Sequence, residues 1–350
     1  MKKIIDNDQT SKKKKMKPWK KKLLIGFGII FFIGASVFGY FAYRANKSIN
    51  NITGENQSIF DTARSLLSGA TNKQLKSDNG RTNIVLLGMR GENDPNGGLL
   101  SDSIMILSMQ QESKKVAMVS IPRDLRVTVP GTKGYSKLNA AHAIGFRQKP
   151  PQGLQYTMQV LEDVTGMPMH YGVSVDFIAF KGIIDALGGI TVNAESDFYD
   201  PNYDGGIRVK KGLNELDSDK ALKYVQARLT SNDFDRSRRQ REVMTAIKDK
   251  AEQTGAIKNP IFMLNLLENF GTNVRTTMTV EELRIAVDTV STLDMNNMIQ
   301  KGYDTSNDGP FTSQTLPDIG YVIIPRSGNF TAFQKDIQGI FGTEIIEPQQ

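Results

Sequence analysis

The residues best suited to chemistry follow a short apolar run at positions 116–121, which has the composition of a buried strand. Pro122 cannot donate a hydrogen bond within a sheet, so we expect the strand to end there. Arg123 and Asp124 follow directly. Ligands of open α/β sheets bind beyond the strand ends, and Arg is the cation best suited to phosphate oxygens. The segment therefore indicates an anion site, with a solvated Arg–Asp ion pair as the simpler interpretation.

A second charged cluster, at 232–241, begins a predicted helix. Asp233 or Asp235 can cap this helix. Arg236 and Gln240 fall on the side that also carries Val243, so both should point partly toward the core. An inward arginine needs an anion or a carboxylate partner. The cluster fits a polyphosphate site, and it also fits a solvated helix held by local ion pairs.

Two more charged residues lie where elements are expected to begin. Asp102 stands at the point where a Gly-rich and Asn-rich loop enters a strand. Lys137 precedes a predicted helix that begins at Ala140, with Asn139 as its expected N-cap. A cation near a helix N-terminus is locally unfavourable unless an anion shares the site. The position of Lys137 therefore also indicates anion binding.

Composition and motifs exclude several kinds of active site. The chain has no Cys and two His, which excludes thiol catalysis, thiolate metal sites and disulfides. It contains no nucleophile elbow, P-loop or dinucleotide fingerprint. The candidates that remain are carboxylates at element junctions and nearby cations: Asp102, Asp124, Asp233, Asp235, Arg123, Lys137, Arg228 and Arg236. Such a set suits phosphoryl or pyrophosphoryl transfer, with Mg²⁺ as the hard cation that phosphates and carboxylates prefer.

The N-terminal region predicts a membrane anchor. Residues 1–22 form a Lys-rich tail, and 23–43 are 21 uncharged residues, enough to span about 30 Å of hydrocarbon. The positive-inside rule places the tail in the cytoplasm and the rest of the chain outside, at the cell membrane. A cleaved signal peptide is the alternative, but 23–43 is long for one. We read 44–80 as an extracytoplasmic stalk and 81–345 as the catalytic domain.

Net charge argues against a nucleic-acid partner. The chain carries +7 in total, but its first 22 residues hold ten Lys and two Asp, which leaves −1 for the remainder. Duplex-DNA binders normally carry a basic footprint on the folded domain. A near-neutral domain with a membrane anchor and an anion site instead indicates a lipid-linked phosphate as substrate.

The pattern of the domain predicts an α/β fold. Apolar runs at 82–88, 102–109 and 116–121 predict three strands close together in sequence. An amphipathic helix at 152–166 and a βαβ unit at 169–192 follow, the latter with a Gly pair after its helix. We read 255–345 as completion of the same core.

Taken together, these segments resemble the LytR–CpsA–Psr family of membrane-anchored enzymes from mainly Gram-positive cell envelopes. The match runs in order from about 82 to 250, and no single motif would be specific alone. The matching motifs are Leu100–Ile104, Ser120–Asp124 with Val127, Lys137–Ala140, Tyr171–Val192, Ala221–Val225 and Asp233–Gln240.

The resemblance implies an α/β/α sandwich with a central mixed sheet. It implies an enzyme that transfers an anionic glycopolymer, such as teichoic acid or capsule, from a polyprenyl-pyrophosphate carrier to peptidoglycan with Mg²⁺ or Mn²⁺. By motif, Asp102 would bind the metal and Asp233 would act as base or hold an arginine. The residues that would bind the pyrophosphate are Arg123, Lys137, Arg228, Arg236 and Gln240.

The chain departs from the family pattern at two places. Many members carry Gly-x-Asp after the first strand, with the Asp as second metal ligand, where this chain has Gly88-Met89-Arg90. Either Glu92 or Asp94 replaces that ligand, or metal binding is weaker or different. Many members also carry Arg-x-Arg where this chain has Gln226-Ala227-Arg228. Two other functions stay open: a pyrophosphatase acting on the same lipid, and a membrane-bound transcriptional regulator, which the expected orientation disfavours.

Overall fold

The computed structural model describes most of the chain after its first 73 residues. The described residues are 74–96, 98–148, 151–203, 205–227, 233–256, 273–290, 292–294 and 297–342. Two units, Met1–Arg44 and Ala45–Gln350, divide the chain, and every described residue belongs to the second. The predicted tail and anchor, and the stalk before residue 74, lie outside the described residues. Within the described part, no helix combines the length and apolar character needed to cross a bilayer.

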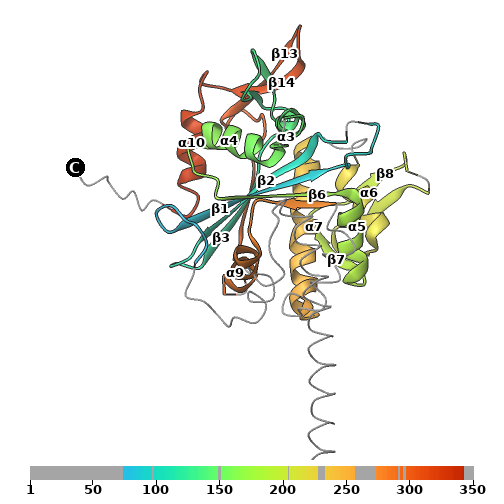
Figure 1. Ribbon diagram of the computed structural model, residues 1–350. Coiled ribbons are helices and arrows are strands. Elements are labelled where there is room, and N and C mark those ends of the chain that lie inside the picture. The colour runs from blue at the N-terminus through green and yellow to red at the C-terminus, as the bar shows by residue number, and fades with distance from the viewer. Residues whose placement is uncertain are drawn as a thin grey trace, which may run out of the picture. The chain divides into compact units, whose positions relative to one another are not determined.

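A six-stranded mixed sheet forms the centre of the described domain (Figure 1). Its strands in spatial order are β11 (Val274–Thr276), β6 (Tyr171–Asp176), β1 (Arg81–Met89), β2 (Ser101–Gln110), β3 (Lys115–Ser120) and β12 (Ile299–Gly302). β1 pairs in parallel with β6, and β3 with β12, while the other neighbours are antiparallel. The predicted α/β class with a mixed sheet is confirmed.

The first three predicted strands are β1, β2 and β3. Each observed strand lies within a residue or two of the apolar run that predicted it, because the side chains of these runs are mostly buried. β3 ends at Ser120, two residues before Pro122. The chain then enters the segment that carries Arg123 and Asp124 at one end of the sheet.

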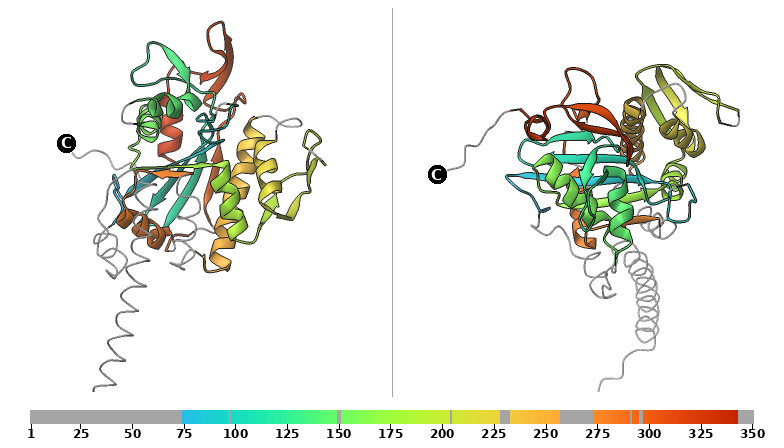
Figure 2. Two further views of the ribbon diagram at one scale, coloured as in Figure 1. Left: turned by 45° about the vertical axis from the view of Figure 1, so that its right-hand side comes forward. Right: turned by 90° about the horizontal axis from the view of Figure 1, so that it is seen from above.

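Helices and short hairpins surround this sheet (Figure 2). The helices are η1 (Leu138–Ala140), α3 (Ala141–Phe146), α4 (Gly153–Thr165), α5 (Phe177–Ala186), α6 (Ser218–Gln226), α7 (Asp233–Gln253), α9 (Val280–Val290) and α10 (Thr331–Gln338). The hairpins pair β4 (Arg126–Thr128) with β5 (Tyr135–Lys137), β7 (Ile190–Ala194) with β10 (Gly212–Leu216), β8 (Phe198–Asp200) with β9 (Ile207–Val209), and β13 (Phe311–Leu316) with β14 (Gly320–Pro325).

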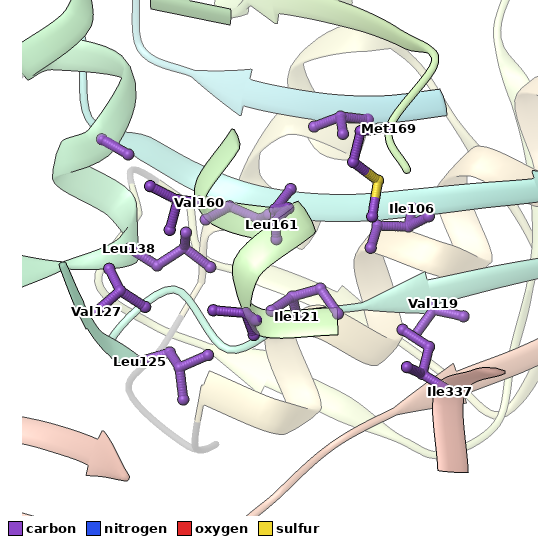
Figure 3. Close-up of a cluster of buried hydrophobic side chains, with 14 of the residues drawn as sticks. Ile106, Val119, Ile121, Leu125, Val127, Leu138, Val160, Leu161, Met169 and Ile337 are labelled. Atoms are coloured by element: carbon purple, nitrogen blue, oxygen red, sulfur yellow. The ribbon is translucent and has the colours of Figure 1, made fainter. Parts of the chain in front are cut away.

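One face of the sheet is closed by α4 and α10. Successive side chains of a strand point to opposite faces, and Val85 and Ile106 point to this one. They join a buried cluster with Leu161 of α4 and Ile337 of α10, all fully buried (Figure 3). This cluster is the main core of the domain.

The opposite face is covered in two parts. Near β11, Tyr171 and Ile84 pack against Ile285 of α9. Toward the ends of β1, β2 and β6, the same face looks onto α5, α6 and α7, which pack around the β7–β10 hairpin. Helices therefore lie on both faces of the sheet, but only the first face is closed along its whole length.

Local capping is present at one helix and absent at another where the sequence predicts it. Asp176 caps α5 by accepting a hydrogen bond from the Ala179 N–H, at 2.9 Å. Asn139 does not cap the helix that the sequence predicts to begin at Ala140. The chain first forms the 3₁₀ turn η1, in which Asn139 is buried, and α3 starts at Ala141. The Asn139 N–H instead bonds to the Arg123 carbonyl at 2.9 Å, a tertiary contact that local propensity could not reveal.

Candidate active site

A pocket of about 1100 Å³ opens between the second face of the sheet and helices α5, α6 and α7. One part of its wall is charged and comes from the ends of β1, β2 and β5, the loop after β3, and the start of α7. The apolar part lies farther along the strands and helices: Leu86, Met105, Val173, Val175, Phe177, Phe180, Ile183, Leu222, Val225, Met244 and Ile247. From Arg236 to Ile247, α7 advances by about 16 Å at 1.5 Å per residue, so the charged and apolar ends are well separated.

Arg123 stands at the centre of the charged end. Its Nη1 donates a short hydrogen bond to the Asp102 carboxylate. Its Nε lies 3.4 Å from Asp233 Oδ1 and 3.6 Å from Asp124 Oδ2. This Nε–H is buried and has no hydrogen-bond partner among the described residues. A buried N–H without a partner is costly, so the geometry favours an anion that fills this position.

Arg236 is the second buried guanidinium of the site. It belongs to the first turn of α7 and is only 3% exposed, as its inward position on the helix predicted. Its Nη2 lies 2.6 Å from Asp233 Oδ1 and 3.3 Å from the Asp102 carbonyl oxygen. Its Nε–H, like that of Arg123, is buried and lacks a hydrogen-bond partner in the described part of the chain. Burial lowers the pKa of the Arg236 guanidinium, although Asp233 opposes the shift.

Asp233 joins the two arginines. Burial raises the pKa of the Asp233 carboxyl above its ordinary value, and the charges of Arg236 and Arg123 act against this rise. The carboxylate is therefore a stronger base than an ordinary surface aspartate, while its two cationic neighbours still favour its ionised form. This fits the predicted choice of roles for Asp233, which are to hold an arginine or to accept a proton.

Lys137 and Asp124 form a third part of the charged end. Lys137 ends β5, and its Nζ lies 3.1 Å from Asp124 Oδ1. Asp124 therefore contacts two cations, since Arg123 is its other neighbour. Asp124 is thus placed to orient both cations. Lys137 lines the pocket, as a phosphate-binding residue would.

Two predicted phosphate ligands are less fully described. Gln240 lines the pocket, but its Nε2 lies 3.4 Å from the Val225 carbonyl oxygen, a long hydrogen bond to the end of α6. Arg228 lies outside the described residues. Gln226, two positions before it, lines the pocket, so the chain leaves α6 beside the site.

Arg90 is a site residue whose contacts the sequence did not reveal. It follows the last residue of β1 and lines the pocket, with its Nε 3.7 Å from Asp102 Oδ2 and its Nη1 3.9 Å from Asp94 Oδ2. Asp94 is thus an ion-pair partner of Arg90, and Glu92 is exposed. The sequence does show that Arg90 stands where Gly-x-Asp would have its Asp. It does not show where the Arg90 side chain points.

The donors at the charged end do not suit Mg²⁺. Among the described residues, no three His, Cys, Asp or Glu side chains gather in an arrangement that could hold a metal ion. Both oxygens of Asp102 face guanidinium groups, those of Arg123 and Arg90. Mg²⁺ requires a nearly octahedral shell of oxygens, and adjacent cations repel it.

Comparisons with known proteins agree with this geometry. TagT of Bacillus subtilis (strain 168), a polyisoprenyl-teichoic acid–peptidoglycan teichoic acid transferase, is 28% identical over 307 residues, or 85% of this chain and 90% of the relative. TagU of Bacillus licheniformis, a transferase with the same description, is 30% identical over 75% of this chain and 81% of its own length. The crystal structure of B. subtilis TagV superposes with a TM-score of 0.57 at 26% identity, over 76% of this chain and 100% of that one.

The profile of one protein family covers most of the sequence. It is the LytR_cpsA_psr family, and the match spans residues 36–314, which include every candidate site residue named above. The motifs that predicted this family meet at one pocket. Its lining includes Asp102, Arg123 and Lys137 from the sheet side and Arg236 and Gln240 from α7, and Asp233 contacts both arginines. The chain belongs to the LytR–CpsA–Psr family.

Proposed function

We propose that this chain transfers an anionic glycopolymer, teichoic acid or a related cell-wall polymer, from a polyprenyl-pyrophosphate carrier to peptidoglycan. The observation that carries the proposal is the two-part pocket. Its charged end offers two buried guanidinium N–H groups that have no hydrogen-bond partner among the described residues, and its other end is apolar. A lipid pyrophosphate likewise has a charged head group at one end and an apolar chain at the other.

The apolar end is suited to a prenyl chain. Drug-sized ligands occupy pockets of about 300–1,000 Å³, and this pocket, at about 1100 Å³, is larger. Val173 of β6, Phe180 of α5 and Ile247 of α7 place branched and aromatic side chains on three sides. Buried methylene groups contribute about 0.8 kcal/mol each, so an isoprenoid tail would bind tightly here.

The charged end supports transfer at the phosphate that carries the glycan. A hydroxyl of peptidoglycan forms a bond to that phosphorus, and the bond to the bridging oxygen breaks, so that polyprenyl phosphate leaves. Arg123 and Arg236 neutralise the charge that develops on the leaving phosphate. Asp233 accepts the proton of the attacking hydroxyl. Lys137 binds the phosphate oxygens near Asp124.

The relatives support the choice of substrates. Their names describe teichoic acid transferases that act between a polyisoprenyl carrier and peptidoglycan. One solved structure of similar fold is TagT bound to a wall-teichoic-acid ligand. We therefore expect the same classes of donor and acceptor for this chain, with the lipid bilayer as the place where the donor is found.

Membrane attachment completes the proposal. We propose that 23–43 span the cell membrane once, with the tail 1–22 in the cytoplasm and the domain outside, as an α/β/α sandwich on the stalk. Helices on both faces of the sheet support the sandwich, and the charge asymmetry around 23–43 supports the orientation. The Mg²⁺ or Mn²⁺ implied by the family resemblance is not part of this proposal, because both oxygens of Asp102 face guanidinium groups.

Transfer in vitro tests the function. The full chain in detergent is incubated with a polyprenyl-pyrophosphate glycan and peptidoglycan, and glycan attached covalently to peptidoglycan is measured. We expect a conjugate from the wild type and a loss of conjugate with Arg123→Ala. Release of free glycan phosphate in place of the conjugate would show a pyrophosphatase. No product of either kind, or equal product from the variant, would contradict the proposal.

A further inference from the structure

Arg90 differs from Arg123 and Arg236 in the length of its contacts with carboxylates. Arg123 and Arg236 each make at least one short bond to a carboxylate. Among the described residues, Arg90 makes only long ion pairs, at 3.7 Å to Asp102 and 3.9 Å to Asp94. Neither distance is a hydrogen bond. Within the described residues, its guanidinium N–H groups thus remain available to a ligand.

The position of Arg90 is fixed by the backbone around it. It directly follows β1, whose last residue, Met89, pairs with Ser101 of β2 and with Asp176 of β6. The loop that follows is closed at its base, where the Gly91 N–H bonds to the Gly98 carbonyl at 3.0 Å. Gly91 has φ of +123° and lies against Asp176, so a larger residue would not fit there without strain. Arg90 is therefore held at the rim of the pocket before a ligand arrives.

The side chain of Arg90 also has a support. Its Cζ lies 5.7 Å from the centre of the Phe177 ring, which lines the same pocket at the start of α5. The side chain is 37% exposed. A guanidinium beside an aromatic ring at a half-open position can turn its donors toward an anion while it keeps the contact with the ring.

Asp102 is the expected metal ligand, and its surroundings are those of an ion pair. One oxygen bonds to Arg123 and the other faces Arg90, so two positive charges already neutralise one carboxylate. A divalent cation bound to Asp102 would lie within a few ångströms of both guanidiniums and would be repelled by them. A pyrophosphate at the same place would be attracted by both.

We propose that Arg90 binds the pyrophosphate of the lipid substrate directly, beside Asp102, so that this chain binds isoprenoid pyrophosphates without a divalent metal ion. The inference rests on the function proposed above and adds that Arg90 supplies the positive charge beside Asp102. Arg90, Arg123 and Arg236 then form three sides of the pyrophosphate site. Guanidinium groups suit this role because their donors match two phosphate oxygens at once.

Binding of a defined probe tests the inference. Geranylgeranyl pyrophosphate is titrated into the full chain in detergent by calorimetry, once with excess EDTA and once with excess MgCl₂. We expect the wild type to bind with dissociation constants that agree within about threefold in the two buffers. Arg90→Asp should bind about 10- to 100-fold more weakly in EDTA, as the loss of hydrogen bonds to a charged group would produce. MgCl₂ should restore part of that loss, because the new carboxylate lies beside Asp102.

Matched variants exclude simpler explanations. Arg208 is exposed, stacks on Tyr199 with its Cζ 4.4 Å from the ring centre, and does not line the pocket. Arg208→Asp makes the same change of charge and should bind like the wild type. Arg90→Gln keeps a polar side chain and should also weaken binding in EDTA, without recovery in MgCl₂. Thermal unfolding of each variant shows that the domain is intact.

Three results separate the possible failures. Wild-type binding that requires MgCl₂ would overturn the inference and leave the proposed function standing. Equal binding by Arg90→Asp and wild type in EDTA would do the same. No binding of the probe in either buffer would contradict the proposed function itself.

Discussion

The two faces of the central sheet differ in what covers them. On the first face, α4 and α10 close over the strands, and side chains such as Ile106 and Leu161 are fully buried. On the second face, α5, α6 and α7 leave a pocket of about 1100 Å³ above β1, β2 and β6. The same strands supply both faces, since Val85 points to the closed one and Leu86 lines the pocket.

The difference shows how one sheet can combine stability with binding. Close packing on the first face stabilises the fold and requires no ligand. On the second face, apolar side chains line an open space and buried arginines lack some of their hydrogen bonds, so stability there is lower than it could be. A lipid pyrophosphate would fill the apolar space with its chain and accept the missing hydrogen bonds with its phosphate oxygens. We therefore predict that substitutions on the first face change stability and that those on the second change function.

The largest expected effect on the pocket side comes from Asp233→Asn. Loss of a general base lowers a rate by about 10²- to 10⁴-fold, and we expect transfer to fall by that range. Burial raises the pKa of Asp233. As pH decreases, wild-type transfer should therefore begin to fall at a higher pH than an ordinary aspartate would give. The acid limb of the pH–rate profile should disappear in the variant.

Asp235→Asn is the matched control for this change. Asp235 lies on the same first turn of α7, is 42% exposed and pairs with Arg238 at 3.7 Å. Transfer and its pH profile should stay close to those of the wild type. An acid limb that persists in Asp233→Asn, or that disappears equally in the control, would show that Asp233 is not the base.

Arg123→Ala should have the next largest effect. Removal of one preorganised donor to a developing oxyanion costs about 10²- to 10³-fold in rate, and Arg123 contacts three carboxylates that would lose a partner. Transfer by the full chain measures the loss. Arg208→Ala, at an exposed arginine outside the pocket, should leave transfer unchanged. A similar loss in both variants would contradict a specific role for Arg123.

A leucine pair sharpens the comparison of the two faces directly. Leu161→Ala on the closed face should lower the free energy of unfolding by about 2–5 kcal/mol, because the cavity cannot be filled, and should leave lipid affinity nearly unchanged. Leu222→Ala on α6 only enlarges an existing pocket, so it should cost less than about 1 kcal/mol and weaken binding of geranylgeranyl pyrophosphate. Urea unfolding and calorimetry measure the two quantities. Equal changes of the two variants in free energy of unfolding and in lipid affinity would contradict the difference between the two faces.

His142 provides a prediction about pH that concerns the closed side alone. It is 4% exposed in α3, and burial lowers its pKa from 6.5 to about 4. The folded state therefore favours neutral His142, so its contribution to stability is complete above pH 6.5 and is lost as pH falls toward 4. The loss amounts to roughly 3 kcal/mol for a shift of this size. His142→Gln should lose less stability than the wild type across this interval, while an equal loss in both proteins would contradict the prediction.

The charged part of the site could be predicted because each residue stands at an element boundary. Asp102 begins a strand, Arg123 follows Pro122, and Arg236 occupies the first turn of a helix, so apolar periodicity and breakers located them. The two ion pairs of Arg90, with Asp102 and with Asp94, could not be predicted. They depend on the conformation of the loop that follows β1, and sequence spacing does not determine that conformation.

The apolar part of the pocket could not be distinguished from core by its sequence pattern. Val173, Phe180 and Leu222 follow the periodicities of buried strands and helices, and these patterns show that a side chain is covered without showing whether it meets protein or ligand. The predicted cap at Asn139 was wrong for a related reason. A tertiary hydrogen bond to the Arg123 carbonyl replaces the local one.

The most direct test of the account is a crystal structure of the chain with geranylgeranyl pyrophosphate. We predict that the pyrophosphate oxygens lie within hydrogen-bond distance of Arg123 Nε and Arg236 Nε, two buried donors of the site that lack hydrogen-bond partners in the described chain. We predict that the prenyl chain runs past Val173 and Phe180 toward Ile247. A pyrophosphate bound away from both arginines, or a prenyl chain outside the space between the sheet and α5–α7, would contradict the account.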